Sequence, residues 1–251
     1  MPLLFANNMK HILSYGGGVN SSALYFYILD KGLPLDEVIF ADTGSELEET
    51  YASVKMLQAQ CAKDNTQFTI VNSKEGNIYN YYYDRQMFPY RTFRSCTDKF
   101  KIRPIRKYIR SKYGKQEKFT MYIGITWDEA TRCKTSNVKY ITHSYPFVDD
   151  KIDRKGNDNI LIAKGFTATK SGCYFCPFQS KKSWSDLCKE KPDLFAASKK
   201  LEKNCSAYPK FTLHPSFALE KLERDIKQQK SLNDFDDPEA NCDSINGGCF
   251  L

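Results

Sequence analysis

The chain has 251 residues, a length that allows one α/β domain with an appendage or two small domains. Hydrophobic residues make up 41% and charged residues 27%, which excludes disordered and fibrous proteins, and no segment approaches the ~18 consecutive apolar residues of a membrane span. The net charge of +7 favours partners that carry phosphate, and without a secretory-signal pattern we expect a cytoplasmic protein with no membrane partner.

The first half of the chain alternates strand-like and helix-like segments, as a parallel sheet with crossover helices requires. Short apolar runs predict strands, and apolar residues at helical spacing predict the helices between them. The predicted strands cover residues 12–15, 37–41, 67–71 and 119–125. The predicted helices cover residues 22–31, residues 99–113, and a segment that starts with an S-x-x-E capping box at residues 45–48 and continues to residue 61.

From about residue 126 the sequence becomes irregular and then helical. Pro192 and Pro215 suit the first turns of helices that continue with apolar residues at helical spacing. We therefore expect an α/β fold, an open parallel sheet with helices on both faces, plus a smaller irregular and helical C-terminal part. The predicted boundary separates an α/β domain at residues 1–145 from a cysteine-containing loop and helical region at residues 146–251.

A glycine-rich turn joins the first predicted strand to the first predicted helix, where residues 14–22 are S-Y-G-G-G-V-N-S-S. Consecutive glycines let the backbone close around phosphates, and the free N–H groups at a helix start bind anions. The turn lacks the Lys-Ser/Thr ending of a Walker A loop and the G-x-G-x-x-G spacing of a dinucleotide-binding loop. By itself it is either a phosphate loop of another kind or a plain strand–helix link.

Residues 14–21, together with F-A-D-T-G at residues 40–44, resemble the PP-loop (ATP-pyrophosphatase) superfamily, specifically its phosphoadenosine phosphosulfate (PAPS) reductase branch. The family loop is S-G-G-x-D-S, and here Gly16 stands for the first serine and Asn20 for the aspartate. Three further segments resemble that branch in the same order. They are R-S-C-T at residues 94–97 with its following basic residues and Pro104, G-I-T at residues 124–126 with Asp128, Glu129 and Arg132, and S-G-C-Y-F-C-P at residues 171–177.

The resemblance implies an adenine nucleotide alpha-hydrolase-like sheet that binds its nucleotide at the carboxyl ends of the strands. The implied catalytic residues are Ser21, Asn20 and Arg132, with a magnesium ion accompanying the phosphates. A strand-end turn is the alternative interpretation of residues 42–44, and an exposed acidic turn with its counter-ion is that of residues 128–132. The implied nucleotide-binding residues are Ser14, Gly16, Gly17, Gly18, Ser21, Ser22, Asp42, Thr43, Gly44 and Gly124.

The nine cysteines are an odd number in a chain without an export signal, which favours thiols or metal ligands over a disulfide framework. Cys173 and Cys176 form a C-x-x-C pair between a glycine and a proline, where two thiolates can hold one metal. Two reduced thiols or a redox dithiol are the alternatives for this pair.

A four-thiolate site needs two further cysteines. Cys96 is the predicted third, because its segment resembles the C-C-x-x-R-K-x-x-P element of iron–sulfur sulfonucleotide reductases, with Ser95 in place of one cysteine. Cys249 is the predicted fourth, because the preceding N-G-G lets the terminus fold back. The resemblance implies an Fe–S cluster, [4Fe–4S], whereas the spacing equally allows zinc. The other candidates for the fourth ligand are Cys242, Cys188 and Cys205.

Residues 91–118 hold eleven lysines and arginines but only two acidic residues. Such a run is commonly a solvated helix face. Beside a phosphate loop, the same cations would neutralise nucleotide phosphates or hold a nucleic-acid backbone.

The function implied by the resemblance is cleavage of ATP to AMP and pyrophosphate, which adenylates a substrate for sulfur transfer. Its partners would be a sulfur donor and a nucleic-acid substrate. The alternative reaction is reduction of an activated sulfate nucleotide, PAPS or APS, with release of sulfite and a thioredoxin-like reductant. The third hypothesis is a non-catalytic nucleotide-binding module with structural zinc.

Overall fold

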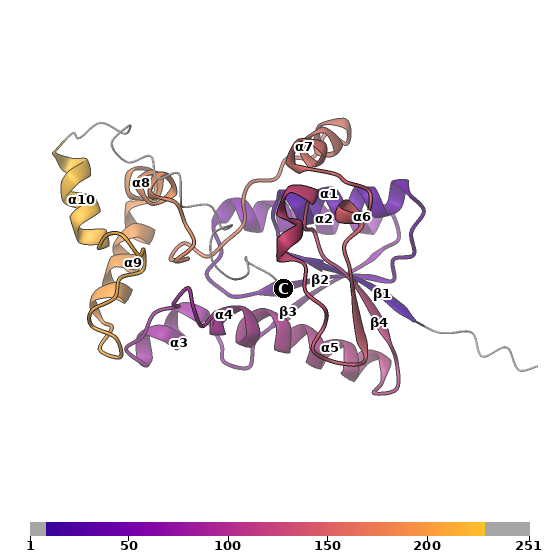
Figure 1. Cartoon of the computed structure of the whole chain (residues 1–251), viewed down its shortest axis with the longest axis horizontal. Coiled ribbons are helices and arrows are strands. Elements are labelled where there is room, and N and C mark those ends of the chain that lie inside the picture. Colours follow the sequence, from indigo (N-terminus) through magenta and orange to yellow (C-terminus); the bar gives the residue numbers. More distant parts are fainter. Residues whose placement is uncertain (1–8, 229–251) are drawn as a thin grey trace, which may run out of the picture.

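Five parallel strands form one open sheet in the computed structural model, which describes residues 9–228 (Figure 1). Their order is β3-β2-β1-β4-β5, and every neighbouring pair is parallel. The strands are β1 (Lys10–Tyr15), β2 (Glu37–Asp42), β3 (Gln67–Asn72), β4 (Phe119–Tyr122) and β5 (Ile141–Ser144). The predicted open parallel sheet is confirmed, and β5 adds an edge strand that the sequence analysis missed.

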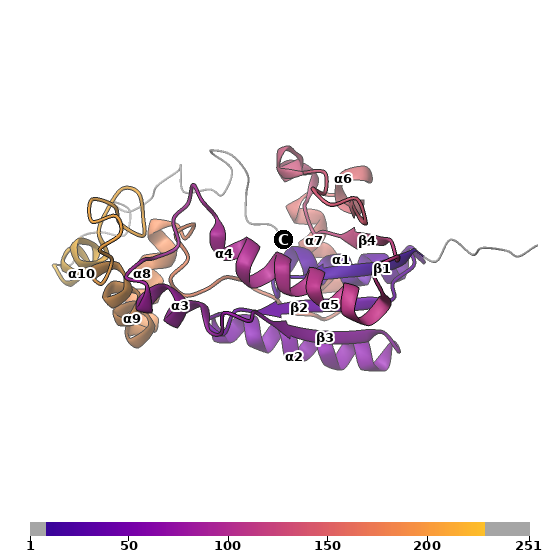
Figure 2. The same ribbon diagram turned by 90° about the horizontal axis from the view of Figure 1, so that it is seen from below.

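Helices cover both faces of the sheet, which confirms the predicted layers (Figures 1 and 2). The helices of these layers are α1 (Val19–Asp30), α2 (Glu48–Lys63), α5 (Arg103–Tyr113) and α7 (Arg154–Ala163). In β1, Ile12 lies in the same apolar cluster as Ile109 of α5, whereas Leu13 clusters with Leu24 of α1. Successive side chains of a strand point to opposite faces, so a sheet covered on both faces requires strands that are continuous apolar runs.

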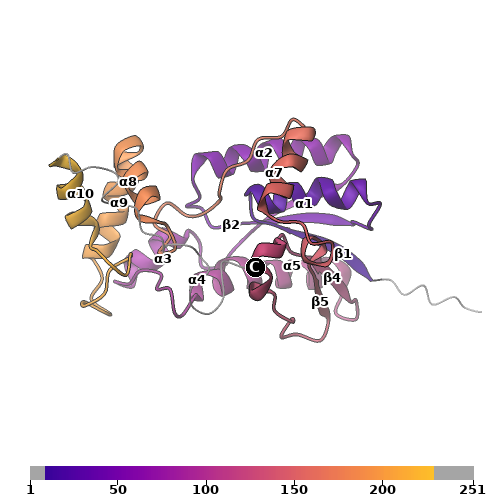
Figure 3. The same cartoon turned by 45° about the horizontal axis from the view of Figure 1, so that its top comes forward.

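The C-terminal helices gather at one end of the molecule, beside α3 (Figures 1 and 3). The helices at this end are α3 (Ile78–Asp84), α8 (Lys181–Glu190), α9 (Pro192–Lys203) and α10 (Leu219–Lys227). Trp184, Phe195 and Leu222 share one apolar cluster with Tyr82 and Phe100. The core of the helical C-terminal part therefore includes side chains that precede residue 145, and the boundary at that residue stays a prediction.

Short helical turns complete the architecture. They are α4 (Ser95–Thr97), a π-helical turn η1 (Asp98–Ile102), a 3-10 turn η2 (Trp127–Arg132) and α6 (Pro146–Asp149). Within residues 9–228, no helix combines the length and the apolar character needed to cross a membrane.

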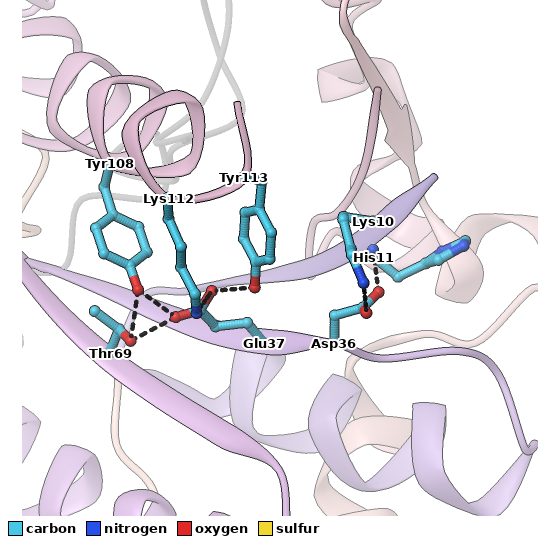
Figure 4. Close-up of polar contacts among 8 residues, drawn as sticks. All are labelled: Lys10, His11, Asp36, Glu37, Thr69, Tyr108, Lys112 and Tyr113. Carbon is cyan, nitrogen blue, oxygen red and sulfur yellow. Dashed lines mark hydrogen bonds and ion pairs between the residues drawn. The ribbon is translucent and has the colours of Figure 1, made fainter. Parts of the chain in front are cut away.

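A buried carboxylate joins α5 to strands β2 and β3 (Figure 4). Glu37 is fully buried, and its Oε2 accepts hydrogen bonds from Lys112 Nζ at 2.9 Å and from Tyr113 OH at 2.7 Å. Its Oε1 accepts from Tyr108 OH at 2.8 Å and from the Thr69 hydroxyl. These five residues, named here the Glu37 cluster, surround the amino end of β2, where Glu37 is the first residue. They fix α5 at the opposite end of β2 from the edge where an open α/β sheet binds ligands.

Candidate functional site

The loop between β1 and α1 has the geometry of an anion cradle. Gly17 has φ +75°, and a Cβ on it would lie 2.6 Å from Thr50 Cγ2 of α2, so both conformation and space require glycine. The first hydrogen bond of α1 runs from the Ser22 N–H to the Gly18 carbonyl at 3.0 Å. The N–H groups of Val19, Asn20 and Ser21 therefore have no partner inside the helix and are available to an anion.

The serines of this loop hold its shape. Ser21 Oγ accepts from the Gly16 N–H at 3.1 Å and contacts the Gly18 carbonyl at 3.2 Å, and Ser22 Oγ donates to that carbonyl at 2.9 Å. Ser14 Oγ, at the carboxyl end of β1, is buried and has no hydrogen-bond partner among residues 9–228. A ligand or a water molecule is expected to bind at a buried polar atom that has no hydrogen-bond partner.

The segment after β4 contacts the first turn of α1. A Cβ on Gly124 would lie 2.9 Å from the carbonyl carbon of Asn20, so only glycine permits this approach. The Asn20 amide donates to Glu129 Oε2 at 3.4 Å, and Arg132 forms an ion pair with Glu129. Three predicted site residues, Asn20, Gly124 and Arg132, are thus brought together beside the glycine loop. Thr126 Oγ1, in the same segment, is a second buried atom without a partner in the described part of the chain.

The predicted residues at the end of β2 form a tight turn. Asp42 Oδ1 accepts from the Gly44 N–H at 2.7 Å and from Tyr51 OH at 2.8 Å. Gly44 has φ +74°, and a Cβ there would lie 2.8 Å from Asn77 Nδ2. The Thr43 side chain is buried and its Oγ1 lies 3.4 Å from Cys173 Sγ. Asp42 and Gly44 therefore shape the turn, while Thr43 connects it to the cysteine loop.

The cysteine loop, residues 171–174, contacts both the segment after β2 and the glycine loop. On one side Glu46 and Cys173 form an antiparallel β-bridge, and the Tyr174 N–H donates to the Ser45 carbonyl at 3.2 Å. On the other side Ser171 packs on the glycine loop, since a Cβ on Gly18 would lie 2.7 Å from Ser171 Oγ. Segments separated by more than 120 residues in the sequence thus meet at the carboxyl ends of β1 and β2.

Glu46 is a residue of the site that the sequence analysis missed. The sequence predicts a capping box at residues 45–48, but the N-cap of α2 is Leu47, whose apolar side chain cannot accept a cap bond. Ser45 and Glu46 instead pair with the cysteine loop. The buried Glu46 carboxylate accepts from Thr43 Oγ1 at 3.0 Å and pairs with Lys101 Nζ at 3.3 Å. The only signal in the sequence is an acidic residue four positions beyond a buried strand.

The predicted metal ligands are placed as follows. Cys173 and Cys176 form one turn, with the Cys176 N–H bonded to the Cys173 carbonyl at 3.0 Å, and Cys96 lies in α4. Among residues 9–228, no three Cys, His, Asp or Glu side chains gather closely enough to hold a metal ion. Cys249 lies outside the described residues, as does the alternative Cys242, while Cys188 and Cys205 pack in the helical C-terminal part. As placed, the described thiols do not fit a cluster, and we derive no reaction step through one.

Burial raises the pKa of the Cys173 thiol well above its usual range, and the Glu46 carboxylate adds to this effect. Since the thiolate is the reactive form, we expect iodoacetamide to modify Cys173 of metal-stripped protein more slowly than in urea-unfolded protein at about pH 8. The rate should continue to rise as the pH passes the ordinary thiol value of about 8.5. Mass spectrometry of the peptide that carries Cys173 measures this. Equal rates in folded and unfolded protein would contradict it.

Comparison with known proteins places this chain within a family. The family model of the phosphoadenosine phosphosulfate reductase domain matches residues 10–141, more than half of the chain, from β1 to the first residue of β5. Two uncharacterized proteins of Methanocaldococcus jannaschii, MJ0066 and MJ0973, are 24% and 26% identical to this chain over 203 and 202 residues. These matches cover 73% and 72% of this chain but only 39% and 45% of the relatives, so the chain spans less than half their length.

Two solved structures are similar at low identity. One is the PAPS reductase from Candida auris in a phosphate complex, at 12% identity and a TM-score of 0.45, with 66% of this chain and 76% of that chain covered. The other is the U34-tRNA thiolase NcsA from Methanococcus maripaludis with its [4Fe-4S] cluster, at 13% identity and a TM-score of 0.48, with 88% and 82% covered. On the family match, the chain belongs to the phosphoadenosine phosphosulfate reductase domain family of PP-loop proteins.

Proposed function

We propose that this chain binds ATP with its phosphates in the loop of residues 14–22 and cleaves it to AMP and pyrophosphate in order to activate a substrate for sulfur transfer. The observation that supports this proposal best is the contact of the cysteine loop with both the glycine loop and the β2 turn. A thiol and an anion cradle in one site suit a reaction that joins nucleotide and sulfur chemistry.

The proposed reaction has two steps. A substrate oxygen attacks the α-phosphorus, the bond between the α-phosphorus and the bridging oxygen breaks, and pyrophosphate leaves. In the second step Cys173 takes the outer sulfur of a donor persulfide, which leaves as a thiol, and the Cys173 persulfide then attacks the adenylated carbon, so that AMP leaves with the substrate oxygen. A second thiol cleaves the remaining sulfur–sulfur bond, forming a disulfide with Cys173 and releasing the thiolated substrate. The free N–H groups of the glycine loop and the first turn of α1 would stabilise the charge that develops on pyrophosphate.

Magnesium would supply further neutralisation, since it binds mainly through phosphate oxygens and one or two carboxylates. Glu129, which contacts Asn20 and pairs with Arg132, is the carboxylate beside the first turn of α1 that would contribute to it. We propose nucleic acid as the acceptor, held by the basic segment of residues 91–118. Three cations of that segment already have carboxylate partners, because Lys101 pairs with Glu46, Arg103 with Asp98 and Lys112 with Glu37.

The test is pyrophosphate release from ATP by anaerobically purified protein, with cellular RNA as the acceptor, a persulfide as the sulfur donor and dithiothreitol as the thiol that releases the product. We expect Cys173→Ala to retain ATP binding but to lose at least about 90% of sulfur incorporation, because a removed reacting group is rarely replaced. Cys61→Ala, in the last turn of α2 and away from the site, is the matched control. Iron, sulfide and zinc in the same preparation test the predicted thiolate set, and a colourless, metal-free or zinc-loaded protein would contradict the predicted Fe–S cluster.

Reduction of PAPS or APS is the second candidate, favoured by the family that the chain matches. It requires a nucleophilic thiol near the C-terminus in the sequence E-C-G-x-H, and the residues around Cys249 include neither the glutamate nor the histidine. Sulfite release from either nucleotide with thioredoxin, in the absence of pyrophosphate release from ATP, would replace the first proposal by the second. Nucleotide binding without either product would support a non-catalytic module.

A further inference from the structure

Arg154 is the first residue of α7, and its guanidinium reaches the first turn of α1. Its Nη1 donates to Asn20 Oδ1 at 3.3 Å, and its side chain is about half exposed. We propose that Arg154 binds the nucleotide phosphates, and that asparagine rather than aspartate at position 20 keeps its charge available for them. This inference rests on the proposed function, since it concerns the same phosphate loop.

The start of α7 is held in place beside the phosphate loop by several contacts. The Arg154 N–H donates to Asp128 Oδ1 at 3.2 Å, and the Trp127 N–H donates to the Ile152 carbonyl at 2.8 Å. Asp153 caps the helix by accepting from the Gly156 N–H at 2.8 Å. Arg154 is therefore attached to the segment that also carries Glu129 and contacts the start of α1.

The guanidinium has no strong partner of its own. Its ion pair with Asp158 is 3.6 Å long between two half-exposed side chains, a kind of pair that contributes little. Its bond to Asn20 is to a neutral amide. A phosphate oxygen is a better partner than either, because charge-assisted bonds from arginine to phosphate are short, strong and often bidentate.

The neighbours of Asn20 determine what this position can hold. Its Nδ2 donates to the Glu129 carboxylate, while its Oδ1 accepts from Arg154. Aspartate could accept from Arg154 but would face Glu129 with a second negative charge, and it would neutralise the guanidinium by an ion pair. Asparagine bonds to both neighbours and leaves the arginine charge uncancelled.

The effect of Asn20→Asp on nucleotide binding distinguishes a role of Arg154 from the expectation that the family loop sets. The family loop has aspartate where this chain has Asn20, so restoring that residue would be expected to help if the loop alone determined binding. If Arg154 binds the phosphates, Asn20→Asp should instead weaken binding, because it adds a negative charge beside them and captures the arginine.

The experiment is calorimetric titration of the full chain with ATP, inorganic pyrophosphate and adenosine. We expect Arg154→Ala and Asn20→Asp each to weaken ATP and pyrophosphate binding about tenfold, with adenosine binding unchanged. Arg154→Lys should give an intermediate affinity, since lysine keeps the charge but not the planar donor pair. In the double variant the two effects should fall short of their product, because both act through one guanidinium.

Lys155→Ala is the matched control, since it removes the same charge from an exposed neighbouring position. It should leave all three affinities unchanged. Arg154→Ala with wild-type affinity for pyrophosphate, or Asn20→Asp with higher affinity, would overturn the inference while leaving ATP binding by the wild type intact. Equal weakening of adenosine and pyrophosphate binding would show that Arg154 only fastens α7 to α1, which also overturns it. A wild type that binds no ATP would refute the proposed function itself.

Discussion

Alanine in place of Gly18 is expected to slow pyrophosphate release from ATP by about a hundredfold, because it separates the glycine loop from the cysteine loop. The added Cβ would lie 2.7 Å from Ser171 Oγ and 3.2 Å from the Ser171 backbone nitrogen. Gly18 has φ −110°, a conformation that alanine adopts freely, so the effect comes from this contact and not from backbone strain. The same change at Gly17 would be harder to interpret, since its φ is +75°.

A second substitution tests whether the contact with Ser171 causes the loss. Ser171→Gly removes the side chain that the new methyl group meets, so Gly18→Ala/Ser171→Gly should recover a large part of the lost activity. Gly172→Ala is the control, because it adds a methyl group to the same loop where nothing lies within 4 Å. Turnover and thermal unfolding of the four proteins measure the effect. A folded Gly18→Ala variant with normal turnover, or a double variant no better than the single one, would show that the two loops act independently.

The sheet could be predicted from the sequence because its central strands are continuous apolar runs. β5 was missed because only Ile141 of I-T-H-S is buried, so the segment has no apolar run to detect. The helix α7 was also missed, since its first half, R-K-G-N-D-N, contains residues with low helix propensity. Packing of Leu161 against α1 stabilises it instead, and such packing is not visible in local sequence.

The candidate site likewise contains residues that a local pattern predicts and residues that only tertiary contacts reveal. Gly17 and Gly18 can be recognised from the sequence alone, because the turn that they form is made of consecutive residues. Glu46 and Arg154 do not, since their partners Lys101 and Asn20 are 55 and 134 residues away in the sequence. The contact between Ser171 and the glycine loop is likewise tertiary. Local pattern and the family resemblance therefore predicted the glycine loop and Arg132, while Glu46 and Arg154 required the structure.

Methionine in place of Lys112 is expected to lower the free energy of unfolding by about 3 kcal/mol, because it leaves the buried Glu37 carboxylate without a counter-charge. Burial opposes the charge of Lys112, but its hydrogen bonds to Glu37, Tyr113 and Tyr108 outweigh this and raise its pKa above the usual range. The folded state thus holds this proton more tightly than the unfolded state. The stabilisation is complete below the ordinary lysine pKa of about 10.4 and falls as the pH rises further, so the difference between wild type and variant should shrink there.

Urea unfolding at neutral pH, followed by circular dichroism, measures these free energies. A double variant then tests whether the loss comes from the unpaired Glu37 charge. Removing both charges with Glu37→Gln/Lys112→Met should restore most of the lost stability, because a neutral amide in the Glu37 cluster no longer needs a cation. Lys10→Met is the matched control (Figure 4): Lys10 pairs with Asp36 at 2.9 Å and is about as exposed as Lys112, but Asp36 is 29% exposed whereas Glu37 is fully buried, and the loss should stay below about 1 kcal/mol. If Lys112→Met were no more damaging than Lys10→Met, the buried pair would not be what fixes α5 to the sheet. A double variant as unstable as the single one would mean that the aliphatic stem and the hydrogen bonds of Lys112, rather than its charge, stabilise the cluster.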